Sequence, residues 1–116
     1  MITTILYSTA NLEASCGNDL DFVRQIVEMC CDQMQDLSKQ IQHTAETGNW
    51  PDVYFHAHKL KASIGLLEIA SLKEDIKILT DNAKHVVNTD EILPQAKLIT
   101  GVIEECIEQM KKDYFI

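Results

Sequence analysis

The sequence has few of the residues that interrupt regular secondary structure. It contains two prolines and four glycines in 116 residues, which favours long helices over many short strands. No stretch approaches the ~20 apolar residues that a membrane-spanning helix requires. The first seven residues are mildly apolar but carry no basic residue, so we do not expect a secretory signal peptide.

Cysteines and clusters of metal ligands are also scarce. The four cysteines, Cys16, Cys30, Cys31 and Cys106, contain no C-x-x-C pair and are too few for a disulfide-stabilised scaffold. They favour reduced thiols in a cytoplasmic protein. The chain lacks the H-x-x-x-H and Glu-x-x-His spacings of metal sites and the glycine-rich G-x-x-x-x-G-K-S/T loop that binds ATP. We therefore expect no metal and no other cofactor.

Basic residues are outnumbered by acidic ones. The chain has 10 Lys and Arg against 18 Asp and Glu, a formal net charge of −8. Proteins that bind nucleic acids present clustered Lys and Arg, so we expect no nucleic-acid partner. The 46% content of hydrophobic residues is that of an ordinary globular protein. Because a chain of this length supports one hydrophobic core, the sequence predicts a single domain over residues 1–116.

Two amphipathic helices are predicted in the first half of the chain. The first begins with Asn18 as N-cap and Asp21 three residues later, and it ends near Gly48. The second begins at Trp50-Pro51, where proline suits a first helical turn, and it ends near Gly65. The residues expected to face the core recur every three or four positions: Val23, Val27, Cys30, Met34, Leu37, Ile41 and Thr44, then Val53, Ala57, Leu60 and Ile64.

Two more helices follow, and a short helix around residues 11–16 precedes the set. The last helix runs from about Leu93, with Pro94 fixing its start. Their expected core residues are Ile69, Leu72, Ile76, Leu79 and Ala83, with Val86 as a further candidate, and then Ile99, Ile103, Cys106 and Met110. Four such helices with short connections predict an all-α protein, an antiparallel up-down-up-down four-helix bundle. Because packing in the bundle buries the apolar face of each of the four helices, we expect a monomer.

His58 lies on the second predicted helix, outside its core stripe. It is about 100° round the helix from Ala57 and about 160° from Leu60, which places its ring on the solvent side. Lys61 and Ala62 are its neighbours one turn further along the same helix.

An exposed histidine with these neighbours suits the reversible carriage of a phosphoryl group. A neutral imidazole is a nucleophile near neutral pH. Lys61, and less directly Lys59, can offset charge on the oxygens of a transferring phosphoryl group. Ala62 leaves room for the active site of another protein to dock over the ring. The spacing alone fits a solvated surface histidine equally well.

The same residues resemble a known family. The run His58-Lys59-Leu60-Lys61-Ala62-Ser63 resembles the His-x-Leu-Lys-Gly-Ser signature of histidine-containing phosphotransfer (HPt) domains. Residues 17–23 resemble the Gly-Asp-x-x-Phe-Leu helix opening of that family, and residues 47–50 resemble its Gly-Asp-Trp turn. Leu72, Ile76 and Leu79 fall where its third helix has an apolar repeat. The resemblance covers roughly residues 9 to 112 and implies a helical bundle.

This resemblance implies a phosphorelay carrier and not an enzyme with its own substrate. His58 would accept a phosphoryl group from an aspartate of one receiver domain and pass it to another. Lys61 would be the cation on the phosphate side, and Lys59 a secondary contributor. The implied partners are receiver domains of response regulators or of a hybrid sensor histidine kinase.

Two positions depart from the family pattern. Ala62 replaces the glycine after the lysine, which narrows the approach to His58 by one methyl group. Glu68 stands ten residues after the histidine, where a second glycine is common, while Gly65 comes three residues earlier. We therefore expect a different turn there, with the charge of Glu68 near the docking surface. These departures keep an alternative open, a helical adaptor that binds a signalling partner without carrying phosphate.

Overall fold

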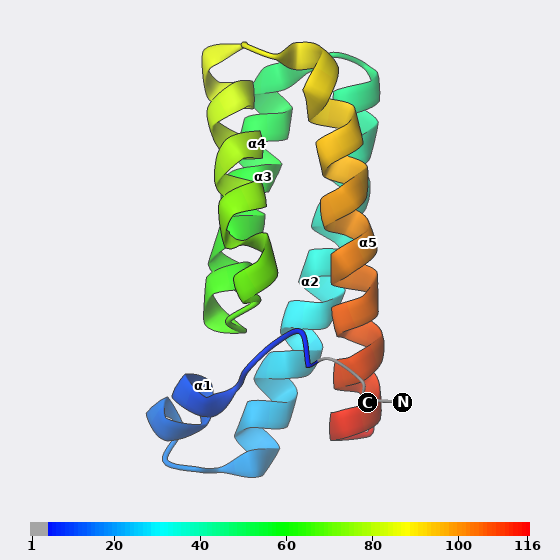
Figure 1. Ribbon diagram of the computed structural model, residues 1–116. Coiled ribbons are helices and arrows are strands. Elements are labelled where there is room, and N and C mark those ends of the chain that lie inside the picture. Colours follow the sequence, from blue (N-terminus) through cyan, green and yellow to red (C-terminus); the bar gives the residue numbers. More distant parts are fainter. Residues whose placement is uncertain (1–4) are drawn as a thin grey trace.

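The computed structural model describes residues 5–116, which form helices joined by short turns (Figure 1). Residues 1–4, the start of the apolar N-terminal stretch, lie outside the described residues. The elements in chain order are α1 (Ala10–Ser15), α2 (Leu20–Glu46), α3 (Trp50–Leu66), the 3-10 turn η1 (Ala70–Leu72), α4 (Lys73–His85) and α5 (Thr89–Tyr114). The prediction of an all-α protein is confirmed, and α1 confirms the short helix expected around residues 11–16.

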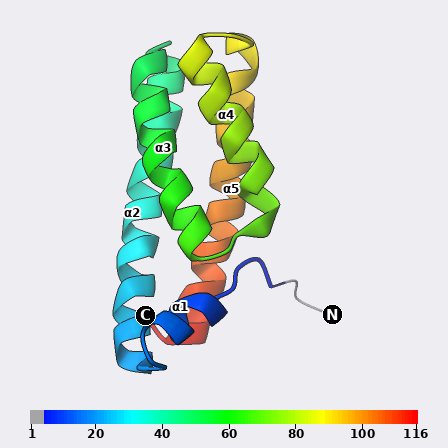
Figure 2. The same cartoon turned by 90° about the vertical axis from the view of Figure 1, so that its left-hand side faces the viewer.

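The four longer helices pack side by side around a shared core (Figure 1, Figure 2). α2 and α4 each contact both α3 and α5. α2 and α5 have 27 and 26 residues, against 17 and 13 in α3 and α4. The two longer helices therefore extend past the other pair at one end, where α1 packs against α2.

The core consists of the predicted apolar stripes. Each residue expected to face inward is buried, except Val86. Burial of a Leu or Ile side chain contributes about 1.5–3 kcal/mol, so these stripes supply most of the driving force for packing. Ile92, Ala96 and Ile107 of α5 complete the core, although the predicted stripe omitted them.

The predicted N-cap of α2 is wrong by one residue. Asp19 is the N-cap, and its Oδ1 accepts a hydrogen bond of 3.3 Å from the backbone N–H of Phe22. Asn18 has a φ of +61° and belongs to the preceding turn. Both side chains can cap a helix, and the left-handed backbone at Asn18 leaves that role to Asp19.

The predicted start of α5 is also wrong. The helix begins at Thr89, so Pro94 lies inside it and removes one backbone donor near the N-terminus. Ile92 and Ala96 on either side of the proline are 0% and 1% exposed. Because burial of these side chains favours continuing the helix, the proline does not end it.

Val86 is not a core residue, contrary to prediction. It is the C-cap of α4, with a φ of +52°, and its side chain is 55% exposed. A left-handed residue cannot continue a right-handed helix, so the apolar stripe of α4 stops at Ala83.

None of the helices within residues 5–116 is long and apolar enough to cross a membrane. The four cysteines carry free thiols, of which Cys16 is partly exposed and the other three are buried. Over the same range, no three His, Cys, Asp or Glu side chains are grouped in a way that could hold a metal ion.

Candidate functional site

The register of α3 is fixed at its first turn. Gly48 has a φ of +72°, which ends α2 and turns the chain. Asn49 is the N-cap of α3, and its side chain accepts a hydrogen bond from the Asp52 N–H (3.4 Å) and donates one to the Asp52 carboxylate (2.7 Å). Pro51 lies in the first turn, where its missing N–H has no helical acceptor. Half-buried Trp50 packs on the core at this end of α3.

His58 lies at the middle of α3 with its side chain exposed to solvent. Ala57 and Leu60 on the opposite side of the helix are both 0% exposed. The structure therefore places the ring on the solvent side, as the periodicity predicted. Within residues 5–116, neither ring nitrogen has a hydrogen-bond partner, so both are open to a reactant.

An aromatic neighbour supports the His58 ring. Tyr54, one turn earlier on α3, has its ring centroid 5.9 Å from that of His58, with an angle of 42° between the planes. Tyr54 is half-buried and packs against the core. This contact restricts where the imidazole lies without covering its nitrogens, and the sequence analysis missed it.

The two predicted lysines have different surroundings. Lys61 is exposed and lies one turn after His58, at the spacing that brings helical side chains together. The Lys59 Nζ lies 4.4 Å from the centroid of the Phe55 ring, a cation–π contact that holds it beside that ring. Lys61 is therefore the better placed of the two to reach a phosphoryl group on His58. Ala62 is also exposed, and its short side chain leaves space beside the His58 ring.

Other candidate side chains do not join this group. Ser63 is only 5% exposed and faces the core. The ring of His56 lies against Phe55, with centroids 5.6 Å apart. His43 and His85 are on α2 and α4, at helix ends. The candidate site therefore consists of His58 with Tyr54, Lys61 and Ala62.

A groove begins next to Lys61 and runs between the end of α3 and the start of α4. Its volume is about 370 Å³. It is lined by residues of three consecutive elements: Lys61, Ile64, Gly65, Glu68, Ile69, Ala70, Lys73 and Ile76. The groove could not be predicted from the periodicity of single helices, because the path of the turn after α3 decides which residues of α4 join Lys61 in its lining.

The turn after α3 has a backbone geometry in which glycine is usual. Leu67 is the C-cap of α3, and Glu68 follows with a φ of +47°. This left-handed conformation costs a non-glycine residue about 1–2 kcal/mol. The Ser8 N–H donates to the Leu67 carbonyl (2.9 Å), and the Asn11 Nδ2 donates to the Glu68 Oε1 (3.0 Å). The carboxylate is thus bonded to α1, beyond the C-terminal end of the helix that carries His58.

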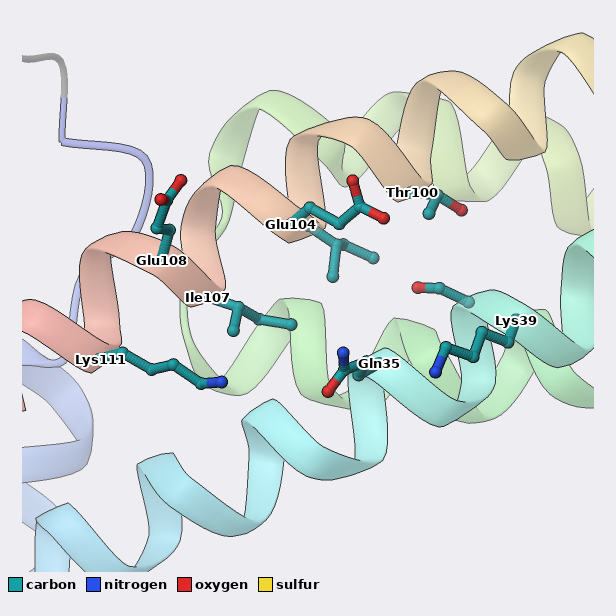
Figure 3. A pocket seen from close by; sticks show the side chains of 9 residues that line it. Gln35, Lys39, Thr100, Glu104, Ile107, Glu108 and Lys111 are labelled. Carbon is teal, nitrogen blue, oxygen red and sulfur yellow. The ribbon is translucent and has the colours of Figure 1, made fainter. Parts of the chain in front are cut away.

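A second cavity, of about 240 Å³, lies between α2 and α5 (Figure 3). Figure 3 shows Gln35, Lys39 and Lys111 extending polar groups into the space between these helices, while Glu108 points away. Ser38 also lines the cavity and is 3% exposed. Because none of the predicted site residues lines it, this cavity is separate from the candidate site.

Comparison of the chain with protein-family models, with curated proteins and with solved structures finds no significant match. The functional interpretation therefore rests on the geometry of α3 and on the resemblance of individual motifs.

Proposed function

We propose that this chain is an HPt-type phosphocarrier, an antiparallel up-down-up-down four-helix bundle that carries a phosphoryl group on His58. The observation that carries the proposal is the exposed imidazole at the middle of α3, whose ring nitrogens have no hydrogen-bond partner within residues 5–116. A histidine kept only for packing or for a structural hydrogen bond would be buried or paired.

The chemistry requires no cofactor of the chain itself. A neutral ring nitrogen of His58 attacks the phosphorus of an aspartyl phosphate on a receiver domain. The N–P bond forms as the bond between phosphorus and the carboxylate oxygen breaks, and the aspartate leaves as its carboxylate. The ammonium group of Lys61 offsets negative charge on the phosphoryl oxygens during transfer. The reverse reaction loads the next receiver.

The turn at Glu68 gives independent support. The HPt family commonly has glycine at the corresponding position, and Glu68 adopts the left-handed backbone that favours glycine. The backbone of this turn is therefore one that glycine would adopt without strain, and this supports the proposal. The Glu68 carboxylate also accepts a hydrogen bond from Asn11 of α1. This bond holds its negative charge toward α1, where it repels a phosphorylated partner at His58 less strongly.

Exposed apolar side chains on α2 and α3 suit a protein partner. Phe55, Ala62 and Leu66 recur at seven and four residues and therefore share one face of α3. Phe55 and Leu66 are 53% and 43% exposed. On α2, Phe22 and Met29 share a face and are 49% and 63% exposed. Exposed apolar side chains of this kind are typical of a docking surface, here for receiver domains of response regulators or of a hybrid histidine kinase.

Phosphoryl transfer from receiver domains tests the proposal. Receiver domains carrying radiolabelled phosphate are mixed with the wild type, with His58→Gln and with the control His56→Gln. We expect label on the wild type and on the control, lost in acid and retained in base, and none on His58→Gln. Stable, unlabelled complexes of the wild type with a receiver would instead favour the adaptor alternative.

A further inference from the structure

We propose that the groove beside Lys61 binds a small carboxylic acid with an apolar chain, and that its occupancy slows phosphoryl transfer. The groove lies where α3 ends and η1 leads into α4. Figure 2 shows the path of the backbone from α3 into α4. The first part of the proposal concerns binding alone. The second part rests on the function proposed for His58, because it requires Lys61 to serve both sites.

The floor of the groove is apolar. Ile64, Ile69 and Ile76 line it and come from α3, the following turn and α4. Each is at most 3% exposed, so the floor is fixed by the core beneath it. A volume of about 370 Å³ lies within the range of small-molecule sites, which combine an apolar lining with a few polar groups.

The charged groups favour an anion. Lys61 of α3 and Lys73 of α4 both line the groove, and Glu68 is the one acidic residue among its lining residues in the described part of the chain. The Glu68 Oε1 accepts a hydrogen bond from Asn11, and its Oε2 is buried without a partner among the described residues. Among the described residues, neither carboxylate oxygen therefore pairs with Lys61 or Lys73. Two cations and one anion leave a net charge of +1, opposite in sign to the whole chain at −8, which matches a monoanion.

Gly65 opens the mouth of the groove. It lies in the last turns of α3 with an ordinary helical φ, and a Cβ atom placed on it would have no atom within 4 Å. Neither the backbone nor the packing therefore requires glycine. The missing side chain leaves space above the isoleucines for an apolar chain. A larger residue at this position would occupy that space without disturbing the core.

Lys61 links the groove to the phosphoacceptor. Its ammonium group can reach a carboxylate in the groove or a phosphoryl group on His58, one turn earlier, but not both fully. A bound carboxylate should therefore slow transfer as loss of the Lys61 charge would, by about tenfold or 1.4 kcal/mol. A phosphoryl group on His58 would compete with a bound carboxylate for the same ammonium group, so phosphorylation of His58 should also weaken carboxylate binding.

The binding test uses amide NMR titration with octanoate, octanol and acetate. We expect octanoate to shift the amide signals of Gly65, Ala70 and Lys73. Octanol lacks the carboxylate and acetate lacks the apolar chain, so each should bind at least about tenfold more weakly. Gly65→Leu should abolish these shifts. Gly101→Leu is the matched control, because Gly101 is another helical glycine with open space around it and lies outside the groove. Octanoate shifts that persist in Gly65→Leu, or none in the wild type, would overturn the site.

The charge balance gives a second binding test. Glu68→Gln keeps an acceptor for Asn11 and removes the only negative charge lining the groove. We expect octanoate to bind a few-fold more tightly to this variant, and octanol binding to stay unchanged. Equal changes for both ligands would show that the charged groups do not recognise the carboxylate.

The regulatory link is tested by the transfer rate with and without saturating octanoate. We expect octanoate to slow transfer about tenfold in the wild type and in Gly101→Leu, and not in Gly65→Leu. If octanoate binds and the transfer rate is unchanged, the regulatory part of the proposal is wrong and the binding site remains supported. If His58 accepts no phosphate, the titration still decides whether the site exists, so the two failures are distinguishable.

Discussion

The two faces of α3 differ in nearly every property that decides what a residue can do. On the inner face, Val53, Ala57 and Leu60 are all 0% exposed and are held by neighbouring helices. On the outer face, His58 and Lys61 are exposed, and the ring of Tyr54 lies against that of His58. The first face fixes the position of the helix and the second presents a reactive group. This separation means that fold and proposed function can be altered independently.

The largest effect on stability is expected on the inner face. Leu60→Ala should lower the free energy of unfolding by about 2–5 kcal/mol, because it removes buried methyl groups and leaves a cavity. Urea unfolding measures this directly. Lys61→Ala, one residue away on the outer face, should change the same quantity by less than about 0.5 kcal/mol. Similar losses of unfolding free energy in both variants would contradict the difference between the two faces.

The contrast between buried and exposed positions extends to the thiols. Burial raises the pKa of the Cys31 and Cys106 thiols to about 11, from about 8.5 in an unfolded chain. Because the folded-state pKa is the higher one, this contribution to stability is complete below pH 8.5 and is lost as the pH rises toward 11. We expect a loss of about 3 kcal/mol per thiol over that range, since each pH unit between the two pKa values corresponds to about 1.4 kcal/mol.

Unfolding measured over a pH series checks this prediction. Cys106→Val should reduce the decline in stability with pH, since it removes one of the buried thiols. Cys16→Val is the control, because Cys16 is partly exposed, and it should leave the decline unchanged. Identical pH profiles for wild type and Cys106→Val would contradict the prediction.

On the outer face, the two lysines should differ in their effect on phosphoryl transfer. Lys61→Ala should slow transfer about tenfold, or 1.4 kcal/mol, without abolishing it. Lys59→Ala should have a smaller effect, since the Lys59 ammonium lies over Phe55. Single-turnover transfer from a phosphorylated receiver measures both. An unchanged rate in Lys61→Ala would remove that residue from the mechanism.

The smallest predicted effect concerns the turn that ends α3. Glu68→Gly should be more stable than Glu68→Ala by about 1 kcal/mol, because only glycine relieves the left-handed backbone. Both variants lose the bond to Asn11, so the comparison isolates the backbone. Thermal unfolding compares the two. Equal stabilities would mean that the turn relaxes when the side chain is removed.

The sequence predicted the helices and their buried faces well because amphipathic periodicity repeats over many residues. It predicted helix starts poorly. At Asn18 and Asp19 two capping residues compete, and the backbone angle that decides between them depends on how α1 meets α2. At Pro94 the local signal for a helix start was outweighed by burial of Ile92, which requires the packed structure.

The candidate site was predicted in part for the same reason. The exposure of His58 follows from its angle to the core stripe within one helix, so the sequence was sufficient. The Tyr54 contact lies at the i+4 spacing and could have been found in the same way. The groove that Lys61 and Lys73 both line could not, because it depends on the path of the turn through Glu68.

The most direct test of the central claim is to locate the phosphate on the protein. After loading from a phosphorylated receiver, phosphorus and proton NMR of the chain identifies the ring protons that couple to phosphorus. The account predicts one phosphoimidazole signal that belongs to His58, disappears on acidification and is absent from His58→Gln. Phosphate on another residue, or a folded protein that takes up none from any receiver, would contradict it.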